Sequence, residues 1–126
     1  MALEPKLDNQ VGNDFCYLKE IMKLEYKIRF DDLEWICPGN DIRYKCYQHN
    51  GYQLRLVEFG KNMEHVNWCF NGHYGFIVSG EMELVFSDQV EVYQTGDAIF
   101  IPDGEAHKHR PRVLSDKVRF FSVEKI

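Results

Sequence analysis

The side chains best suited to chemistry in this sequence are its histidines and cysteines, five of the former and four of the latter. Two histidines, His107 and His109, are two residues apart, so on a β-strand their side chains would point to the same face. Imidazole binds zinc, nickel, copper and iron, and a cysteine thiolate beside it favours such ions over magnesium or calcium. Such residue types could hold a divalent metal if the fold brings them together.

Other catalytic signatures are absent from the sequence. It has no Gly-x-Ser-x-Gly nucleophile elbow, no phosphate-binding loop and no dinucleotide fingerprint. The cysteines form neither a Cys-x-x-Cys pair nor a zinc-finger spacing, and no pair of carboxylates has a spacing typical of acid–base catalysis. Beyond the presence of both residue types, nothing indicates a Cys–His nucleophile.

Short β-strands are the elements expected to position these side chains. Alternating residues predict strands over 42–47 and 52–59, joined at Asn50-Gly51, which tolerates the positive φ of a tight turn. Similar runs predict further strands over 26–30, 75–78, 81–86, 90–93, 98–101, 106–109 and 118–123. Many short strands at nearly even spacing predict an all-β fold, an antiparallel sandwich or barrel.

One domain accounts for the length of the chain. Its 126 residues, 44% of them hydrophobic, suffice for a single core. Residues 1–13 are polar and are expected to form a loose N-terminal arm. Asp14 is expected to cap a short helix over 15–22, where apolar residues recur at helical spacing. Residues 14–126 are then the single domain.

The most specific pattern is the stretch from Gly96 to His107, in which Pro102 and Gly104 stand at fixed intervals. It resembles the second motif of the cupin superfamily, G-x5-P-x-G-x2-H-x3-N, and only the final Asn is replaced, by Pro111. Upstream, the glycines at 60 and 80 fit the ends of the first cupin motif, G-x5-H-x-H-x3,4-E-x6-G. The resemblance implies a small, single-domain, RmlC-like cupin, whose antiparallel β-barrel is also called a double-stranded β-helix or jelly roll.

The same resemblance implies a metal site with an altered set of ligands. In cupins, two histidines and a glutamate of the first motif and the histidine of the second hold one divalent metal. His107 takes the retained histidine position, and His73 takes the position of the glutamate. His109 would add a ligand from the strand face of His107.

The pair of histidines in the first motif is missing. One register puts Val66 and Trp68 at their positions, and a shorter register puts Asn67 and Cys69 there. The expected metal ligands are therefore His73, His107 and His109, with Cys69 as a fourth if the shorter register holds. Zinc, nickel, iron and copper all suit such a set.

Three aromatic side chains are expected to line an apolar substrate pocket beside these ligands: Trp68, which takes an inward position in the longer register, with Tyr74 and Phe100. The alternative is that they fill the barrel or a dimer interface, as large side chains commonly do. In the run 74–78 both faces are apolar or small, and an N-terminal strand or a second subunit would cover the outer one. The sequence therefore predicts a homodimer.

Charge and hydropathy exclude several partners. The net charge is -5, opposite to that of proteins that follow a phosphate backbone, so neither nucleic acid nor an anionic membrane surface is expected. No apolar run approaches the ~18–20 residues that span a bilayer. The first six residues also lack the layout of a signal peptide. The expected location is cytoplasmic.

The predicted function is that of a small cupin barrel that binds a divalent metal and a small polar organic ligand. The resemblance allows oxygenase, isomerase or lyase chemistry without choosing among them, so it leaves open whether the chain is an enzyme. The alternative is a metal-free cupin that binds or senses a small molecule without catalysis.

Overall fold

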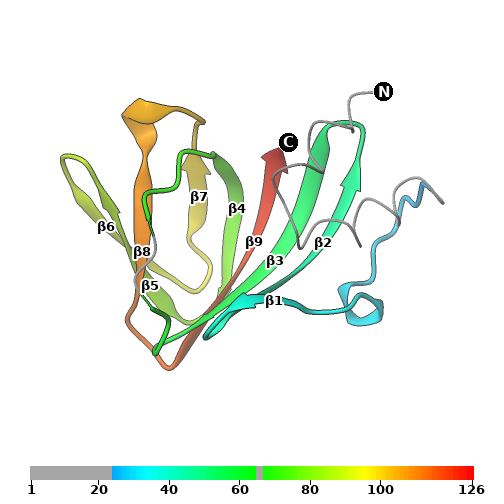
Figure 1. The fold of residues 1–126 in the computed structure, drawn as a ribbon, viewed down its shortest axis with the longest axis horizontal. Helices are drawn as coiled ribbons and strands as arrows, with labels where there is room; N and C mark the ends of the chain where they lie inside the picture. Colours follow the sequence, from blue (N-terminus) through cyan, green and yellow to red (C-terminus); the bar gives the residue numbers. More distant parts are fainter. Residues whose placement is uncertain (1–23, 65–66) are drawn as a thin grey trace.

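The computed structural model describes residues 24–64 and 67–126, which fold mainly into antiparallel strands (Figure 1). The strands are β1 (Ile36–Gly39), β2 (Ile42–His49), β3 (Tyr52–Gly60), β4 (His73–Ser79), β5 (Glu81–Phe86), β6 (Val90–Gln94), β7 (Ala98–Ile101), β8 (His109–Val113) and β9 (Lys117–Lys125). Two 3-10 turns, η2 (Phe30–Asp32) and η3 (Glu105–His107), complete the described elements. The predicted all-β class is confirmed.

Hydrogen bonds join these strands into two antiparallel sheets. The larger has the order β1-β2-β3-β9-β4-β7, and the smaller has the order β6-β5-β8. In the part of the chain that the structure describes, the sheets do not close into one continuous hydrogen-bonded barrel. Figure 1 shows them opening toward the end at which β9 terminates. The predicted N-terminal arm and short helix lie outside the described residues.

The predicted hairpin at Asn50-Gly51 joins β2 to β3. Asn50 has φ 55° and Gly51 has φ 83°, so both residues take the left-handed conformation that a tight two-residue turn requires. The pairing of His49 with Tyr52 closes the hairpin, and the register then continues without a shift to the other end of β2.

The strand predicted over 26–30 is wrong. This segment has no regular strand structure and leads into the turn η2. Tyr26 is 99% exposed, so the alternation of apolar and charged residues does not correspond to a buried and an exposed face. A strand also needs a partner edge, and along β2 that edge is taken by β1.

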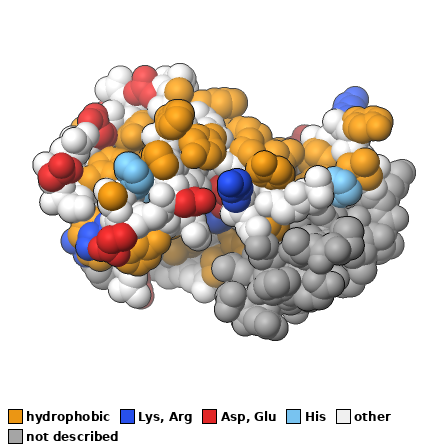
Figure 2. Space-filling model, turned by 90° about the horizontal axis from the view of Figure 1, so that it is seen from above, with side chains coloured by type: hydrophobic (Ala, Val, Ile, Leu, Met, Phe, Trp, Pro, Cys, Tyr) orange, Lys and Arg blue, Asp and Glu red, His pale blue; other side chains and the backbone are white. Residues whose placement is uncertain are grey.

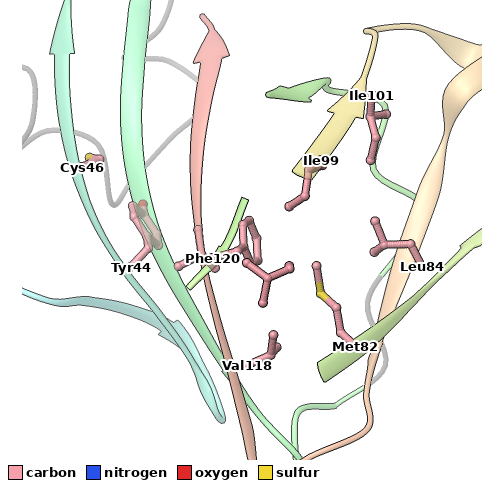
Figure 3. Packing of buried hydrophobic residues seen from close by; sticks show 10 residues of the cluster. Tyr44, Cys46, Met82, Leu84, Ile99, Ile101, Val118 and Phe120 are labelled. Carbon is pink, nitrogen blue, oxygen red and sulfur yellow. The ribbon is translucent and has the colours of Figure 1, made fainter. Parts of the chain in front are cut away.

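The hydrophobic core lies between the two sheets. Met82 and Leu84 of β5 face Ile99 of β7 and Phe120 of β9 across this space (Figure 3). Burial alternates strictly along β9, where Val118 and Phe120 are 0% and 5% exposed. The inner face of β9 continues from these apolar residues toward polar ones near its C-terminal end.

Close approach of β4 to β9 depends on Gly75. A Cβ atom at this position would lie 1.8 Å from the carbonyl oxygen of Phe121, far inside van der Waals contact. Gly75 pairs with Ser122 in the ladder between the two strands. Because His73 begins β4, the glycine helps to bring this histidine against the end of β9.

Large hydrophobic side chains also reach the surface. On the outer faces of β4 and β7, Tyr74, Phe76 and Phe100 are 42%, 47% and 74% exposed. Figure 2 shows hydrophobic side chains gathered in several patches over the end of the molecule seen from above in Figure 1. Among the described residues, no helix is long and apolar enough to cross a membrane.

Candidate metal centre

Cys69 and His109 are brought together by their own backbones. The amide N of Cys69 donates to the carbonyl O of His109 at 2.7 Å, and the amide N of His109 donates to the carbonyl O of Cys69 at 3.0 Å. Residues that exchange both hydrogen bonds in an antiparallel pair place their side chains side by side on one face. The thiol and the imidazole therefore point together into the space between the sheets.

His73 reaches the same space from the larger sheet. It begins β4, one residue before the pairing of Tyr74 with Val123, and so lies opposite Glu124 of β9. Its Nδ1 is 2.7 Å from Oε2 of Glu124, and its Nε2 is 3.8 Å from Sγ of Cys69. The imidazole therefore bridges a buried carboxylate and the thiol.

These three side chains form a cluster that could hold a metal ion. Sγ of Cys69 and one ring nitrogen each of His73 and His109 all lie within 4.8 Å of one another. The rings of the two histidines meet edge to face with centroids 5.0 Å apart. We call Cys69, His73 and His109 the Cys-His-His cluster.

Each imidazole of the cluster is anchored through Nδ1. In His109, Nδ1 donates to the carbonyl O of His107 at 3.0 Å, and Nε2 is buried without a hydrogen-bond partner. In His73, Glu124 accepts the hydrogen bond from Nδ1. Both rings thus have an oxygen acceptor at Nδ1, as metal-binding histidines commonly do, and this leaves Nε2 available for an ion.

The cluster forms one wall of a cavity of about 180 Å³. Apart from the cluster, the lining residues are Arg55, Phe59, Asn67, Met82, Leu84, Ile99, Pro111 and Phe120. Most of these are apolar, so the cavity combines a few polar groups with hydrophobic walls, the usual composition of a small-molecule site.

A buried polar network supports the cluster from behind. Glu124 is 3% exposed and accepts hydrogen bonds from Nε2 of Gln53 at 2.8 Å and from Oγ of Ser122 at 2.9 Å. Nη1 of Arg55 lies 3.3 Å from the same carboxylate. Because a buried carboxylate needs such partners, the network fixes Glu124 and, through it, the ring of His73.

Cys69, His73 and Glu124 shift one another's pKa values, because they lie in contact. Burial raises the pKa of the Cys69 thiol, but the adjacent imidazoles of His109 and His73 outweigh burial and lower the pKa to about 6. Burial lowers the pKa of His73, and hydrogen bonds with Cys69 and Glu124 raise it to about 9.

Burial also raises the pKa of Glu124, whereas the hydrogen bond from His73 and the charge of Arg55 lower it to about 2. Without an ion, the cluster at neutral pH therefore holds a thiolate beside an imidazolium that is paired with a carboxylate.

His107 does not join the cluster. The sequence predicts a strand over 106–109, which would put His107 and His109 on one face. Instead Gly104, with φ 122°, leads into the 3-10 turn η3, and β8 begins only at His109. The side chain of His107 is exposed, and the residue contributes its carbonyl oxygen to His109.

The three aromatic residues expected in the pocket lie outside the cavity lining. Trp68 packs beneath two cations, with Cζ of Arg110 and Nζ of Lys108 at 4.4 Å and 5.1 Å from its ring centroid. Cys69 rather than Trp68 faces the cavity, as the shorter register requires. Tyr74 and Phe100 contact each other on the outside of the sheet, with ring centroids 5.1 Å apart.

Four residues of the site were not predicted from the sequence: Glu124, Arg55, Ser122 and Gln53. One signal was available for β9, because strict alternation from the apolar residues Val118 and Phe120 carries Ser122 and Glu124 onto the buried face. A carboxylate on a core face needs a charged or hydrogen-bonding partner. The partners themselves come from β3 and β4 and could not be named without the register of the sheet.

The donor set fits a divalent ion of the zinc type. With Zn–S near 2.3 Å and Zn–N near 2.0–2.1 Å, tetrahedral ligand atoms lie roughly 3.5 Å apart. Sγ of Cys69 and Nε2 of His73 are already 3.8 Å apart, and the third donor is within 4.8 Å of both. The unpartnered Nε2 of His109 would gain the bond that it lacks. Three ligands would leave a position for water or another molecule.

Comparison with known proteins agrees with this fold. Residues 70–124 match the family described as "Cupin domain". KdgF from Halomonas sp. superposes with a TM-score of 0.66 at 17% identity, covering 80% of this chain and 94% of that one. An RmlC-like cupin from Shewanella frigidimarina gives 0.65 at 17% identity, covering 81% and 91%.

The iron(II) form of HppE gives a TM-score of 0.63 at 12% identity, covering 81% of this chain and 62% of that one. None of the curated proteins compared with the chain matches it significantly. The family match over residues 70–124 and these similar structures show that the chain has a cupin-like fold.

Proposed function

We propose that this chain is a metal-binding cupin that holds one divalent ion through the Cys-His-His cluster and binds a small organic molecule in the adjoining cavity. The observation that carries the proposal is the orientation of the two histidines. Nε2 of His73 lies 3.8 Å from the thiol of Cys69, a ring nitrogen of His109 is within 4.8 Å of the other two donors, and both rings have an oxygen acceptor at Nδ1. A buried ring nitrogen without a partner is costly, and the ion would satisfy the lone pair on Nε2 of His109.

The ion would belong to the group of zinc, nickel, iron and copper. Imidazole and thiolate are poor ligands for magnesium and calcium, which prefer oxygen. When bound, such an ion polarises a carbonyl oxygen or lowers the pKa of a bound water. The protein itself positions the ligands and excludes water: Glu124 holds His73 in place, and the apolar walls keep water out of the cavity.

Similarity to other cupins supports this proposal without choosing a reaction. One of the similar structures is HppE in its iron(II) form, which shares 12% sequence identity with this chain and therefore supports the fold alone. Oxygenase, isomerase and lyase chemistry would all use an open position on the ion beside a small cavity. We therefore propose that the metal site and the ligand cavity together form the functional site, and we assign no reaction to it.

A metal-free binding protein is the second candidate. It is favoured by the charge balance of the cluster, because the thiolate of Cys69, the imidazolium of His73 and the carboxylate of Glu124 stabilise one another without an ion. In that form the cavity would recognise a ligand through hydrogen bonds with the thiolate and the histidines.

Elemental analysis separates the two candidates. Tag-free protein, purified without chelator and dialysed against zinc, is expected to retain about one ion per chain. The variants Cys69→Ser and His109→Ala are expected to retain much less, whereas His107→Ala serves as the matched control and retains the parent level. Parent protein that holds no ion after reconstitution would leave the metal-free candidate.

We also propose that the chain forms a homodimer through the outer faces of β4 and β7. Support comes from the aromatic residues Tyr74, Phe76 and Phe100 on this surface, since such exposed patches commonly mark interfaces. Phe100→Lys is expected to shift the mass measured by light scattering to that of the monomer, and Val92→Lys on β6 is the control. A monomeric parent protein contradicts this proposal.

A further inference from the structure

The cavity beside the Cys-His-His cluster contains one permanently charged side chain that the proposed metal site does not use. Arg55 extends from β3 into the lining of the cavity, and its side chain is 24% exposed. The other lining residues outside the cluster are apolar, apart from the amide of Asn67. An arginine among apolar walls is expensive to bury unless its charge and its donors have a use.

The guanidinium of Arg55 is held in place but not saturated. Nη1 lies 3.3 Å from Oε1 of Glu124, and Cζ lies 4.5 Å from the centroid of the Tyr44 ring. Nε is buried and has no hydrogen-bond partner. Within the described residues, the planar donor group is thus fixed against the cavity with part of its hydrogen-bonding capacity unused, which favours an anionic acceptor.

Glu124 does not cancel the positive charge that a loaded site would carry. Its carboxylate is shared between Arg55 and His73, which stays neutral when it binds an ion. A divalent ion and Arg55 together bring three positive charges, whereas the Cys69 thiolate and Glu124 bring two negative ones. One negative charge on the ligand would balance the cavity.

The size of the cavity restricts the ligand further. About 180 Å³ corresponds to roughly six water molecules at ~30 Å³ each. This is below the range of about 300–1,000 Å³ that is typical of drug-sized ligands. The aromatic and aliphatic walls, among them Phe59 and Phe120, suit a short apolar body.

We propose that the cavity binds a small monocarboxylate, whose carboxylate is held by Arg55 and whose short apolar body lies against the hydrophobic walls beside the metal position. This inference names the ligand class and rests on the proposed metal site. Arg55 could not be assigned this role from the sequence, because its alternation on β3 does not reveal which groups face it across the sheet.

If Arg55 had a purely structural role, its replacement would have a different effect on ligand binding. If the guanidinium served only to neutralise Glu124, replacing it would lower stability and would leave ligand preference unchanged. If Arg55 receives a carboxylate, replacing it removes the preference for an acid over its neutral amide. The relative affinity for two ligands of equal size therefore separates the two roles.

The experiment uses isobutyrate and isobutyramide, which have the same shape and differ in charge. Binding to the zinc-loaded parent, Arg55→Gln and Arg55→Lys is measured by NMR titration, with zinc content and thermal midpoint determined on the same samples. Arg112→Gln is the matched control, since this arginine lies on the surface and pairs with Glu83. Charge-assisted hydrogen bonds predict that the parent binds isobutyrate at least about tenfold more tightly than isobutyramide.

The preference is expected to fall to about onefold in Arg55→Gln, to be intermediate in Arg55→Lys, and to persist in Arg112→Gln. Equal affinities in a zinc-loaded parent overturn this inference alone, and so does a preference that survives in Arg55→Gln. The parent comparison decides the matter even if the variants fail to fold. A parent that retains no zinc overturns the proposed metal site and the inference with it.

Discussion

The thiol of Cys69 offers a sharp test of the electrostatics derived for the metal-free site. Its pKa lies at about 6 instead of 9.0, because the adjacent imidazoles of His109 and His73 outweigh the effect of burial. His73→Gln removes the imidazolium but keeps a hydrogen-bonding side chain. We expect this substitution to move the pKa of Cys69 upward, toward its ordinary value.

The size of the shift in the pKa of Cys69 determines which quantity the experiment should measure. At pH 7, a thiol with a pKa of about 6 is roughly nine-tenths thiolate, whereas a thiol with its ordinary pKa is about one-hundredth thiolate. Intrinsic nucleophilicity falls as the pKa falls, with a Brønsted slope of about 0.4–0.5, so a shift of this size costs roughly 20-fold in reactivity. The two effects largely cancel, and the rate at one pH is a poor measure.

The pH profile is the informative observable. The rate of alkylation of metal-free protein by iodoacetamide is followed by peptide mass analysis from about pH 5 to 10, separately for Cys69 and for the exposed thiol Cys37. The profile of Cys69 should have its midpoint near 6 in the parent and well above it in His73→Gln. Cys37, which lies outside the cluster, should give the same profile in both proteins.

Two results would refute this reasoning. A midpoint near 9 in the parent would mean that the thiol is not held as a thiolate. A low midpoint that persists in His73→Gln would mean that another group lowers the pKa. Zinc loading of the parent should in addition slow the alkylation of Cys69 and leave that of Cys37 unchanged.

The remaining predictions concern acid stability, packing and metal linkage. Because the folded pKa of Glu124 is lowered from 4.5 to about 2, its contribution to stability is present above pH 4.5 and is lost as the pH falls toward 2. Between about pH 5 and 3, urea unfolding should show a loss about 2 kcal/mol larger for the metal-free parent than for Glu124→Gln; equal losses would contradict the assignment. Gly75→Ala places a Cβ against the backbone of Phe121 and should cost about 3 kcal/mol or more, whereas Gly39→Ala, with its nearest atom at 3.8 Å, should cost far less. Chelator should lower the thermal midpoint of zinc-loaded protein, since free zinc at 100 times Kd adds about 2.7 kcal/mol, and should not affect Cys69→Ser.

Much of the fold could be predicted from local residue patterns. The Asn50-Gly51 turn was predictable because the residues that tolerate positive φ are few, and the flanking alternation fixed which side chains lie inside. The strand expected at 26–30 failed for the opposite reason, since alternation alone does not provide a partner edge. The glycine and proline spacing after Gly96 predicted a cupin-like fold before any strand pairing was known.

The site was less predictable because it depends on contacts between distant strands. His73 and His109 were identified by residue type, but the position of Cys69 depended on a one-residue register that sequence left open. His107 was placed on a strand, whereas the 3-10 turn before β8 exposes its side chain. Glu124 could be placed on the buried face, yet only the pairing of β9 with β4 shows that it anchors an imidazole.

X-ray absorption at the zinc edge tests the central claim most directly, because it reports the ligand atoms themselves. For the reconstituted parent protein, we expect one sulfur scatterer near 2.3 Å together with imidazole nitrogens near 2.0–2.1 Å. Cys69→Ser should lose the sulfur shell. A shell of nitrogen and oxygen alone in the parent, or the failure of the protein to retain zinc, would contradict the proposal that Cys69, His73 and His109 form a metal centre.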